Sequence, residues 1–405
     1  MSSLRHSLIP LLAAAGALAA DWPQWRGPNR DGISSETGLL EKWPDTGPPL
    51  AWKTGGLGAG YSSVAVARGR VYTQGQRGDT QHLIALDSET GKKLWEIANG
   101  RGYRERRGDG PRSVPTVDED IVFALAADGS LLAADARSGK KIWSVNILEA
   151  YEGETPHWGI SESPLVDGEH LIVSPGGNGA AVVALDKKTG RLVWKSQDDR
   201  AAYSSPVLAQ VGNLRTILSF SERGALGLRA DNGQLLWRYD KVANQTANIA
   251  TPIFARDHAF YSSDYGTGCA LLRLRAEGSG VKASEVYFSR EMKNHYSSSV
   301  LIGEHLYGFS SSILTAMKFL TGEVAWRDRS VGKGSVTYAG RHLYVLGENG
   351  VVALVEASPA AYKEKSRFTI SKSDRPTWAP PVISEAKLFL RDQDNLYCYS
   401  IKAGK

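Results

Sequence analysis

The sequence of 405 residues has little sulfur and little net charge. It contains two cysteines, Cys269 and Cys398, three methionines, and a formal charge of +5. It has no Cys-x-x-Cys pair, no Gly-x-Ser-x-Gly elbow, no His-Glu-x-x-His motif and no phosphate loop. No motif therefore identifies a reaction, and the small, dispersed positive charge argues against a protein that binds nucleic acid.

Long apolar runs are missing after the N-terminus, so we expect no transmembrane span. Arg5 precedes an apolar run from Leu8 to Ala20, which is too short to cross a bilayer, and Ala17 and Ala19 form an A-x-A cleavage signal. We interpret residues 1–20 as a signal peptide; the alternative is an uncleaved anchor helix. No cysteine follows the run, which argues against a lipid anchor. The sequence predicts an exported bacterial protein, periplasmic or extracellular, and monomeric.

Glycine and tryptophan, by contrast, are abundant, with 43 and 11 residues, and they recur in a pattern. In five segments a tryptophan stands four residues after a glycine, and three of these segments have an aspartate four residues before the glycine. The repeated positions are Asp87, Gly91 and Trp95; Asp135, Gly139 and Trp143; Asp186, Gly190 and Trp194; Gly233 and Trp237; and Gly322 and Trp326. Glycine accepts the positive φ of a tight turn, aspartate caps that turn, and we expect each tryptophan to pack between neighbouring units.

The repeat length and two separate counts predict the fold. The tryptophans from Trp95 to Trp237 are 48, 51 and 43 residues apart, which is typical of the four-stranded blades of a β-propeller. Eight segments open a unit with Ser/Thr-Pro or a looser version of it, and eight fourth strands can be named, including one at Trp52. We therefore predict an all-β, eight-bladed propeller of four-stranded antiparallel blades over residues 50–405, preceded by an N-terminal extension, residues 21–49.

The two ends of the domain predict how the ring closes. The last unit lacks one strand, and residues 50–53 have no strands before them, so we expect the N-terminal strand to pair with residues 396–401. Cys269 and Cys398 then fall three blades apart, in the third strands of the fifth and eighth blades. This separation exceeds what a disulfide can span, and it predicts two free thiols.

The repeat from Asp87 to Trp95 and its copies resemble the tryptophan-docking motif of PQQ-like propellers. The segment from Asp21 to Gly32 is similar to the mature start of exported PQQ-like repeat proteins of bacteria. The family includes quinoprotein alcohol dehydrogenases and a propeller lipoprotein of outer-membrane protein assembly. The resemblance implies pyrroloquinoline quinone (PQQ) with calcium as a possible cofactor. However, the enzymes commonly carry a vicinal Cys-Cys disulfide that this chain lacks.

One position of the repeat varies instead of recurring. Three residues before the proline of each opening, where loops meet near the axis, the chain has Tyr61, Arg112, Ser161, Tyr203, Ile249, Tyr296, Lys333 and Trp378. We take the aromatic and cationic members as a candidate site for an anionic or aromatic ligand: Tyr61, Arg112, Tyr203, Tyr296, Lys333 and Trp378. The alternative is a channel plugged by amphipathic side chains. We predict no metal site, because the carboxylates in the loops match no calcium motif.

Two long loops are further candidates. Residues 99–112 contain five arginines, and residues 148–158 are acidic and aromatic. They could form a binding site or pair with each other as a solvated charge network. Three functions remain open at this stage: a binding or scaffold propeller with a small ligand or a protein partner, a PQQ-dependent alcohol or sugar dehydrogenase, and an outer-membrane assembly factor. Catalytic residues cannot be named.

Overall fold

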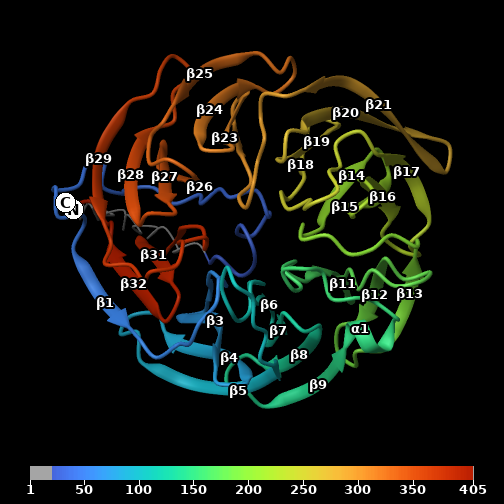
Figure 1. Ribbon diagram of the computed structural model, residues 1–405, viewed down its shortest axis with the longest axis horizontal. Coiled ribbons are helices and arrows are strands. Elements are labelled where there is room, and N and C mark those ends of the chain that lie inside the picture. The colour runs from blue at the N-terminus through green and yellow to red at the C-terminus, as the bar shows by residue number, and fades with distance from the viewer. Residues whose placement is uncertain (1–20, 405) are drawn as a thin grey trace, which may run out of the picture.

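The computed structural model describes residues 21–404, and these residues form eight four-stranded antiparallel sheets around one axis (Figure 1). The predicted eight-bladed, all-β propeller is confirmed. The predicted signal peptide, residues 1–20, lies outside the described residues. Within residues 21–404 the only helix is α1 (Ile147–Ala150), which Asn146 caps by accepting from the backbone N–H groups of Leu148 and Glu149.

Each of seven blades consists of four consecutive strands, of which the first lies nearest the axis and the fourth lies outermost. Blades 1 to 4 comprise β2 (Ala65–Ala67), β3 (Arg70–Arg77), β4 (Thr80–Asp87) and β5 (Lys93–Arg101); β6 (Thr116–Asp118), β7 (Ile121–Leu125), β8 (Ser130–Asp135) and β9 (Lys141–Asn146); β10 (Leu165–Asp167), β11 (His170–Val173), β12 (Val182–Asp186) and β13 (Leu192–Ser196); and β14 (Val207–Val211), β15 (Leu214–Phe220), β16 (Ala225–Arg229) and β17 (Leu235–Tyr239). Blades 5 to 7 comprise β18 (Ile253–Ala255), β19 (His258–Ser263), β20 (Gly268–Glu277) and β21 (Gly280–Ser289); β22 (Val300–Ile302), β23 (His305–Ser310), β24 (Ile313–Lys318) and β25 (Val324–Asp328); and β26 (Gly334–Ala339), β27 (His342–Gly347), β28 (Val351–Glu356) and β29 (Glu364–Thr369).

Blade 8 joins the two ends of the chain. Its strands β30 (Val382–Ser384), β31 (Lys387–Asp392) and β32 (Asn395–Ser400) are completed by β1 (Leu50–Thr54), with Trp52 opposite Cys398 and Lys53 opposite Tyr397. The predicted closure by the N-terminal strand is confirmed. β1 thus gives the eighth sheet its fourth strand and joins the two ends of the chain within one blade.

The turn motif joins blade 8 to blade 1 and recurs at the junctions between blades 1, 2, 3 and 4. Asp87 accepts hydrogen bonds from the backbone N–H and the hydroxyl of Thr90, which fixes the turn before β5. Gly91 follows at φ +68°, and a Cβ there would stand 2.5 Å from the ring of Trp52. The Trp52 indole N–H in turn donates to the carbonyl of Ser88 at 3.1 Å. The turn of one blade thus receives the tryptophan of the blade before it, as the aspartate and glycine of the repeat require.

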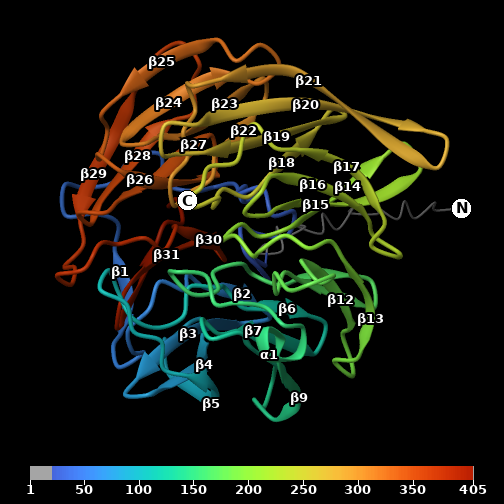
Figure 2. The same cartoon turned by 45° about the vertical axis from the view of Figure 1, so that its right-hand side comes forward.

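Blade 5 departs from this pattern. Its strands β20 and β21 form a long hairpin that projects beyond the ring (Figure 2). Tyr287 occupies the tryptophan position, and its hydroxyl donates to the carbonyl of Phe319 at 2.9 Å. The turn glycines of blade 5, Gly278 and Gly280, do not lie against Trp237, whose indole N–H is buried without a hydrogen-bond partner among the described residues. The predicted free thiols are also present, since Cys269 in blade 5 and Cys398 in blade 8 are unpaired and buried.

The N-terminal extension crosses the centre of the ring (Figure 1). We call residues 22–34 the axial segment. Its backbone pairs with β2 through Trp22 and Val66, with β6 through Pro23 and Val117, and with β26 through Gly32 and Tyr338. A segment that the sequence assigned only as an extension is therefore bonded to the inner strands of several blades, and it fills the axis at one end.

Two arginines of the axial segment complete these contacts. Arg26 donates to the carbonyls of Ser298 and Ser299 of blade 6, and Arg30 donates to the carbonyls of Ser163 and Pro164 of blade 3. Both side chains are buried, and burial lowers their pKa to about 10 and about 9, so both stay charged at neutral pH. Charged donors form strong hydrogen bonds to backbone carbonyls, so Arg26 and Arg30 tie the axial segment to blade 6 and blade 3.

Candidate functional site

The loops that lead from the outer strand of one blade to the inner strand of the next meet at the other end of the axis. They surround a cavity of about 130 Å³. The residues that line it are Trp25, Tyr61, Arg107, Arg112, Trp158, Ser161, Tyr203, Ser205, Ile249, Tyr265, His295, Tyr296, Trp378 and Pro380. Seven of the eight residues at the varying repeat position therefore lie around one cavity. Five of them belong to the six named as candidates: Tyr61, Arg112, Tyr203, Tyr296 and Trp378.

Lys333, the sixth candidate, is not among the residues that line the cavity. Its ammonium lies 3.7 Å from a carboxylate oxygen of Glu348 and 5.8 Å from the ring centroid of Tyr296. The same oxygen of Glu348 accepts the indole N–H of Trp378 at 2.6 Å. Glu348 therefore holds Lys333 behind the aromatic wall and fixes the orientation of Trp378.

Aromatic rings form two opposite parts of the wall. Tyr61 and Trp378 have ring centroids 4.6 Å apart, and Trp378 and Tyr296 have centroids 5.8 Å apart. On another side of the cavity, Trp158 and Tyr203 have centroids 5.7 Å apart, and the Tyr203 hydroxyl accepts the backbone N–H of Trp158 at 3.4 Å. Burial raises the pKa of Tyr203 to about 12, so its hydroxyl stays neutral at physiological pH. The flat faces of these rings can stack on a flat or ring-shaped ligand.

Sequence reasoning missed four aromatic lining residues that occupy other positions of the repeat. Trp158 belongs to the acidic loop, Tyr265 to the turn between β19 and β20, and His295 directly precedes the varying position. Burial lowers the pKa of His295 to about 4, so its imidazole is neutral at physiological pH. Trp25, the fourth, comes from the axial segment. It closes the inner end of the cavity and donates its indole N–H to the hydroxyl of Thr251 at 2.8 Å.

Two arginines give the cavity its charge. Arg112 lies over the rings of Tyr61 and Tyr103, at 5.8 and 4.9 Å from their centroids, and both of its terminal nitrogens donate to carbonyls of its own loop, those of Gly108 and Gly110. Arg107 is exposed, and its guanidinium forms no ion pair with any residue in 21–404. Arg107, one of the five arginines of the long loop, is therefore the free cation at the cavity, while Arg112 also holds the loop in place.

The two long loops do not neutralise each other. Only one ion pair joins them within the described part of the chain: Arg101 with Glu149, at 3.4 Å and exposed to solvent. Tyr103 adds a hydrogen bond from its hydroxyl to the carbonyl of His157 at 2.7 Å. An exposed ion pair of this kind contributes little to stability. The positive charge of the arginine loop thus remains available at the cavity.

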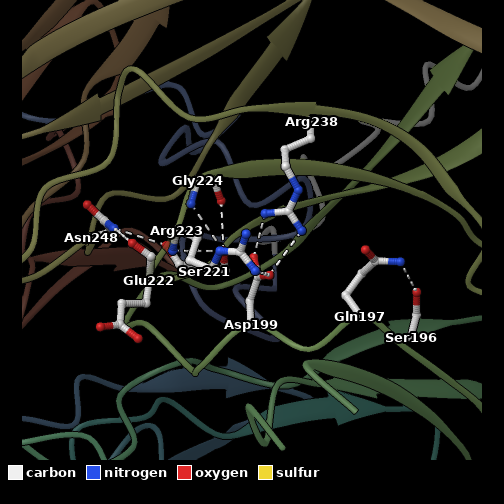
Figure 3. Close-up of polar contacts among 9 residues, drawn as sticks. All are labelled: Ser196, Gln197, Asp199, Ser221, Glu222, Arg223, Gly224, Arg238 and Asn248. Atoms are coloured by element: carbon white, nitrogen blue, oxygen red, sulfur yellow. Dashed lines mark hydrogen bonds and ion pairs between the residues drawn. The ribbon is translucent and has the colours of Figure 1, made fainter. Parts of the chain in front are cut away.

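Two neighbouring loop carboxylates, Asp198 and Asp199, are already engaged in contacts within the protein. Asp199 is buried and accepts two hydrogen bonds from Arg238, at 2.8 and 3.0 Å, and one from the hydroxyl of Ser221 (Figure 3). Asp198 accepts the backbone N–H of Gly179 at 2.7 Å. These contacts hold the loops of blades 3 and 4 in a fixed arrangement, since both partners of the buried ion pair are satisfied.

A calcium-dependent quinone does not fit the cavity. Calcium needs six to eight oxygen ligands, and its protein sites rely on carboxylates, but among residues 21–404 no aspartate or glutamate lines the cavity. Within residues 21–404 no group of three or more His, Cys, Asp or Glu side chains could hold a metal ion. The two cysteines lie in different blades, so they cannot form a vicinal disulfide against a cofactor. We therefore derive no reaction through PQQ and calcium.

The chain resembles both assembly factors and dehydrogenases in sequence. It is 28% identical to quinoprotein alcohol dehydrogenase PedH of Pseudomonas putida over 181 residues, 40% of this chain and 28% of that protein. It is 24% identical to outer membrane protein assembly factor BamB of Shewanella oneidensis over 260 residues, 62% of each chain. The chain thus spans less than two thirds of the length of either relative.

Solved structures show the same fold at low sequence identity. BamB from Moraxella catarrhalis aligns with a TM-score of 0.63 and 15% identity, covering 87% of this chain and 99% of that one. Quinohemoprotein alcohol dehydrogenase from Comamonas testosteroni aligns with a TM-score of 0.67 and 13% identity, covering 95% and 81%.

In residues 21–404 no helix is long and apolar enough to cross a bilayer.

A match to a protein-family model covers more of the chain than either sequence relative does. The family model described as outer membrane protein assembly factor BamB matches residues 41–154 and 149–328, which is more than half of the chain. Together with the eight blades and the tryptophan-docking turns, this match establishes that the chain belongs to the BamB-like family of PQQ-like propellers.

Proposed function

We propose that this protein is an exported propeller that binds a small anionic ligand with a flat apolar face in its axial cavity. The observation that carries the proposal is the cavity lining: aromatic rings on several sides, two arginines and no carboxylate. A site of this composition attracts negative charge and repels none of it, and it offers faces on which a ring can stack.

The contacts assign roles within this site. Arg107 supplies the free positive charge that would pair with a carboxylate of the ligand, and Trp378 and Tyr61 supply the main stacking faces. Arg112 keeps its remaining N–H groups for the ligand while it holds the loop of Gly108 and Gly110. Trp25 limits how deep the ligand can enter. Export is proposed from the leader pattern of residues 1–20.

Isothermal titration calorimetry with quinone cofactors, each without calcium, and with aromatic and non-aromatic organic acids tests the proposal. We expect binding of ring-bearing acids to the wild type and at least tenfold weaker binding to Arg107→Ala, because the variant loses the free cation. Arg106→Ala is the matched control, since Arg106 lies in the same loop but does not line the cavity. Absence of heat with every acid and quinone would rule the proposal out.

A second candidate function is supported by the family match alone: a role in outer-membrane protein assembly, for which the ligand would be a protein partner. Crosslinking in cells with a photoreactive residue at position 107 or 265 distinguishes the two, since both positions lie at the cavity and are exposed. Specific crosslinks to an envelope protein at both positions, combined with no small-ligand binding, favour the assembly role. Residue 277, on the projecting hairpin, serves as the control position.

A further inference from the structure

A second hollow adjoins the axial cavity on the same face of the ring. This hollow has a volume of about 230 Å³. Tyr203 lines both the hollow and the axial cavity, and the rest of the hollow is lined by loop residues that include Arg200, Glu222 and Gln245. A third hollow of about 370 Å³ shares Glu222 and Gln245 with the second and continues to Asp240. The three hollows therefore neighbour one another, with Tyr203 between the first and the second.

The second hollow differs from the axial cavity in chemistry. It carries charges of both signs, and Arg200 and Glu154 already pair with each other at 3.4 Å. The carboxylate of Glu222 points away from the Asp199 cluster in Figure 3 and forms no ion pair with a described residue. The amide of Gln245 likewise makes no hydrogen bond within residues 21–404. The lining of the second hollow thus includes one acceptor and one donor–acceptor group that are free of described partners.

The framework of this hollow is already satisfied and rigid. The amide of Asn248 donates to the carbonyls of Ser221 and Glu222, both at 3.0 Å, and its oxygen accepts the backbone N–H of Asn244. The backbone N–H of Tyr203 donates to the carbonyl of Asn248. All residues around the hollow belong to loops, so it offers no strand edge to which a peptide could add by main-chain pairing.

From this arrangement, and resting on the proposed function, we infer that the ligand is an oligosaccharide with an acidic terminal unit. The terminal uronic acid lies in the axial cavity, where its ring stacks on the aromatic wall and its carboxylate pairs with Arg107. The neutral sugar units follow past Tyr203 into the second and third hollows. Each sugar hydroxyl both donates and accepts, which suits a surface with free Glu222 and Gln245 side chains.

The charges decide where each unit lies. A second uronic acid in the second hollow would meet Glu222 and Glu154, and like charges at close range disfavour binding. The axial cavity, in contrast, contains arginines and no carboxylate. The proposal therefore requires a uronic acid as the terminal unit, in the axial cavity, and neutral sugar units in the second and third hollows.

Calorimetry with four probes tests this inference: glucuronic acid, xylotriose, glucuronosyl-xylotriose, and the best ring-bearing acid from the first screen. We expect glucuronosyl-xylotriose to bind at least about tenfold more tightly than glucuronic acid, and xylotriose to bind more weakly than the conjugate. Glu222→Ala and Gln245→Ala should each weaken the binding of glucuronosyl-xylotriose by severalfold, because they remove contacts with the xylose units. Both variants should bind glucuronic acid with unchanged affinity. Gln210→Ala, on a strand away from the hollows, is the control and should change neither.

Each outcome separates this inference from the proposed function. Equal affinity for glucuronosyl-xylotriose and glucuronic acid, or equal gains in wild type and Glu222→Ala, would overturn the inference. If only the ring-bearing acid from the first screen binds, the axial site stands and the sugar assignment is wrong. If none of the four probes binds, both fail. Tighter binding of xylotriose than of the conjugate would also overturn the inference, because the acidic end would then contribute nothing.

Discussion

The indole of Trp194, on the outer strand of blade 3, lies on the turn glycine of blade 4, Gly233. A Cβ on Gly233 would stand 2.5 Å from the Trp194 ring, and Gly233 has φ +72°. The indole N–H donates at 3.2 Å to the carbonyl of Ala230, which lies in the same turn, three residues before Gly233. The tryptophan and the glycine thus depend on each other: a side chain on the glycine would displace the ring that joins the blades.

Trp194→Ala is expected to lower the free energy of unfolding by about 3 to 5 kcal/mol, since the ring is buried and leaves a cavity between blades. Gly233→Ala is expected to cost about 1 to 3 kcal/mol through the clash and the positive φ. Val193→Ala, one residue away but exposed, should stay within about 0.5 kcal/mol of wild type. Denaturant titration measures all three. A loss below about 1 kcal/mol for Trp194→Ala would mean that the docking contact contributes little to stability.

The two cysteines are expected to be unreactive in the folded protein. Both are buried, and burial raises the pKa of each thiol to about 12, so almost no thiolate forms at pH 8. Iodoacetamide should label neither cysteine in the native protein and both after denaturation without reductant, as read by mass spectrometry. A mass lower by two hydrogens in the denatured, unreduced protein would indicate a disulfide and contradict the structure.

The blade number and the ring closure could be predicted from the sequence because they depend on residues with strong local preferences. Gly91 and its copies must take a positive φ, and Trp95 and its copies need a neighbour to pack against, so both recur at a fixed spacing. The varying position could be predicted as a cavity wall for the converse reason: Tyr61, Arg112 and Trp378 break a symmetry that packing alone would keep.

The axial segment could not be predicted, because its bonds go mainly to backbone carbonyls. Arg26 and Arg30 bind carbonyls of blades 6 and 3, and a carbonyl has no sequence signature. The position of Lys333 could not be predicted for a related reason: its partner Glu348 lies on a different loop, and only the folded ring brings them together. Repeat alignment identifies which loops meet at the axis, but it does not show which side chains turn away from it.

Stability should depend on pH through Glu162, next to the cavity residue Ser161. Glu162 is buried, and desolvation raises its pKa from 4.5 to about 7, against the backbone N–H of Ser174 and the charge of Arg30, which both act to lower it. The folded state therefore favours the protonated acid. This contribution is present in full below pH 4.5 and is lost as the pH rises through about 7.

Glu162→Gln isolates this effect, because glutamine can still accept from Ser174 and never ionises. We expect the variant to match wild type near pH 5 and to exceed its free energy of unfolding at pH 8 by an amount on the order of 3 kcal/mol. Urea titrations at both pH values measure the difference. An equal difference between variant and wild type at the two pH values would show that Glu162 does not titrate in this range.

Substitutions of the two cavity arginines should distinguish an effect on ligand binding from an effect on the order of the loop. Arg112 stacks on Tyr61 and Tyr103 and donates to the carbonyls of Gly108 and Gly110, so Arg112→Ala removes both a ligand contact and the support of the loop. The guanidinium of Arg107, by contrast, makes no hydrogen bond or ion pair with the part of the chain that the structure describes. We therefore expect Arg107→Ala to weaken ligand binding with unchanged hydrogen exchange in residues 102–112, and Arg112→Ala to weaken binding and raise exchange in that loop. Global stability should change by less than about 1 kcal/mol in both, because the blades keep all their contacts. If Arg112→Ala left the exchange of the loop unchanged, its contacts with Gly108 and Gly110 would not be what holds the loop, and the two arginines would have the same role.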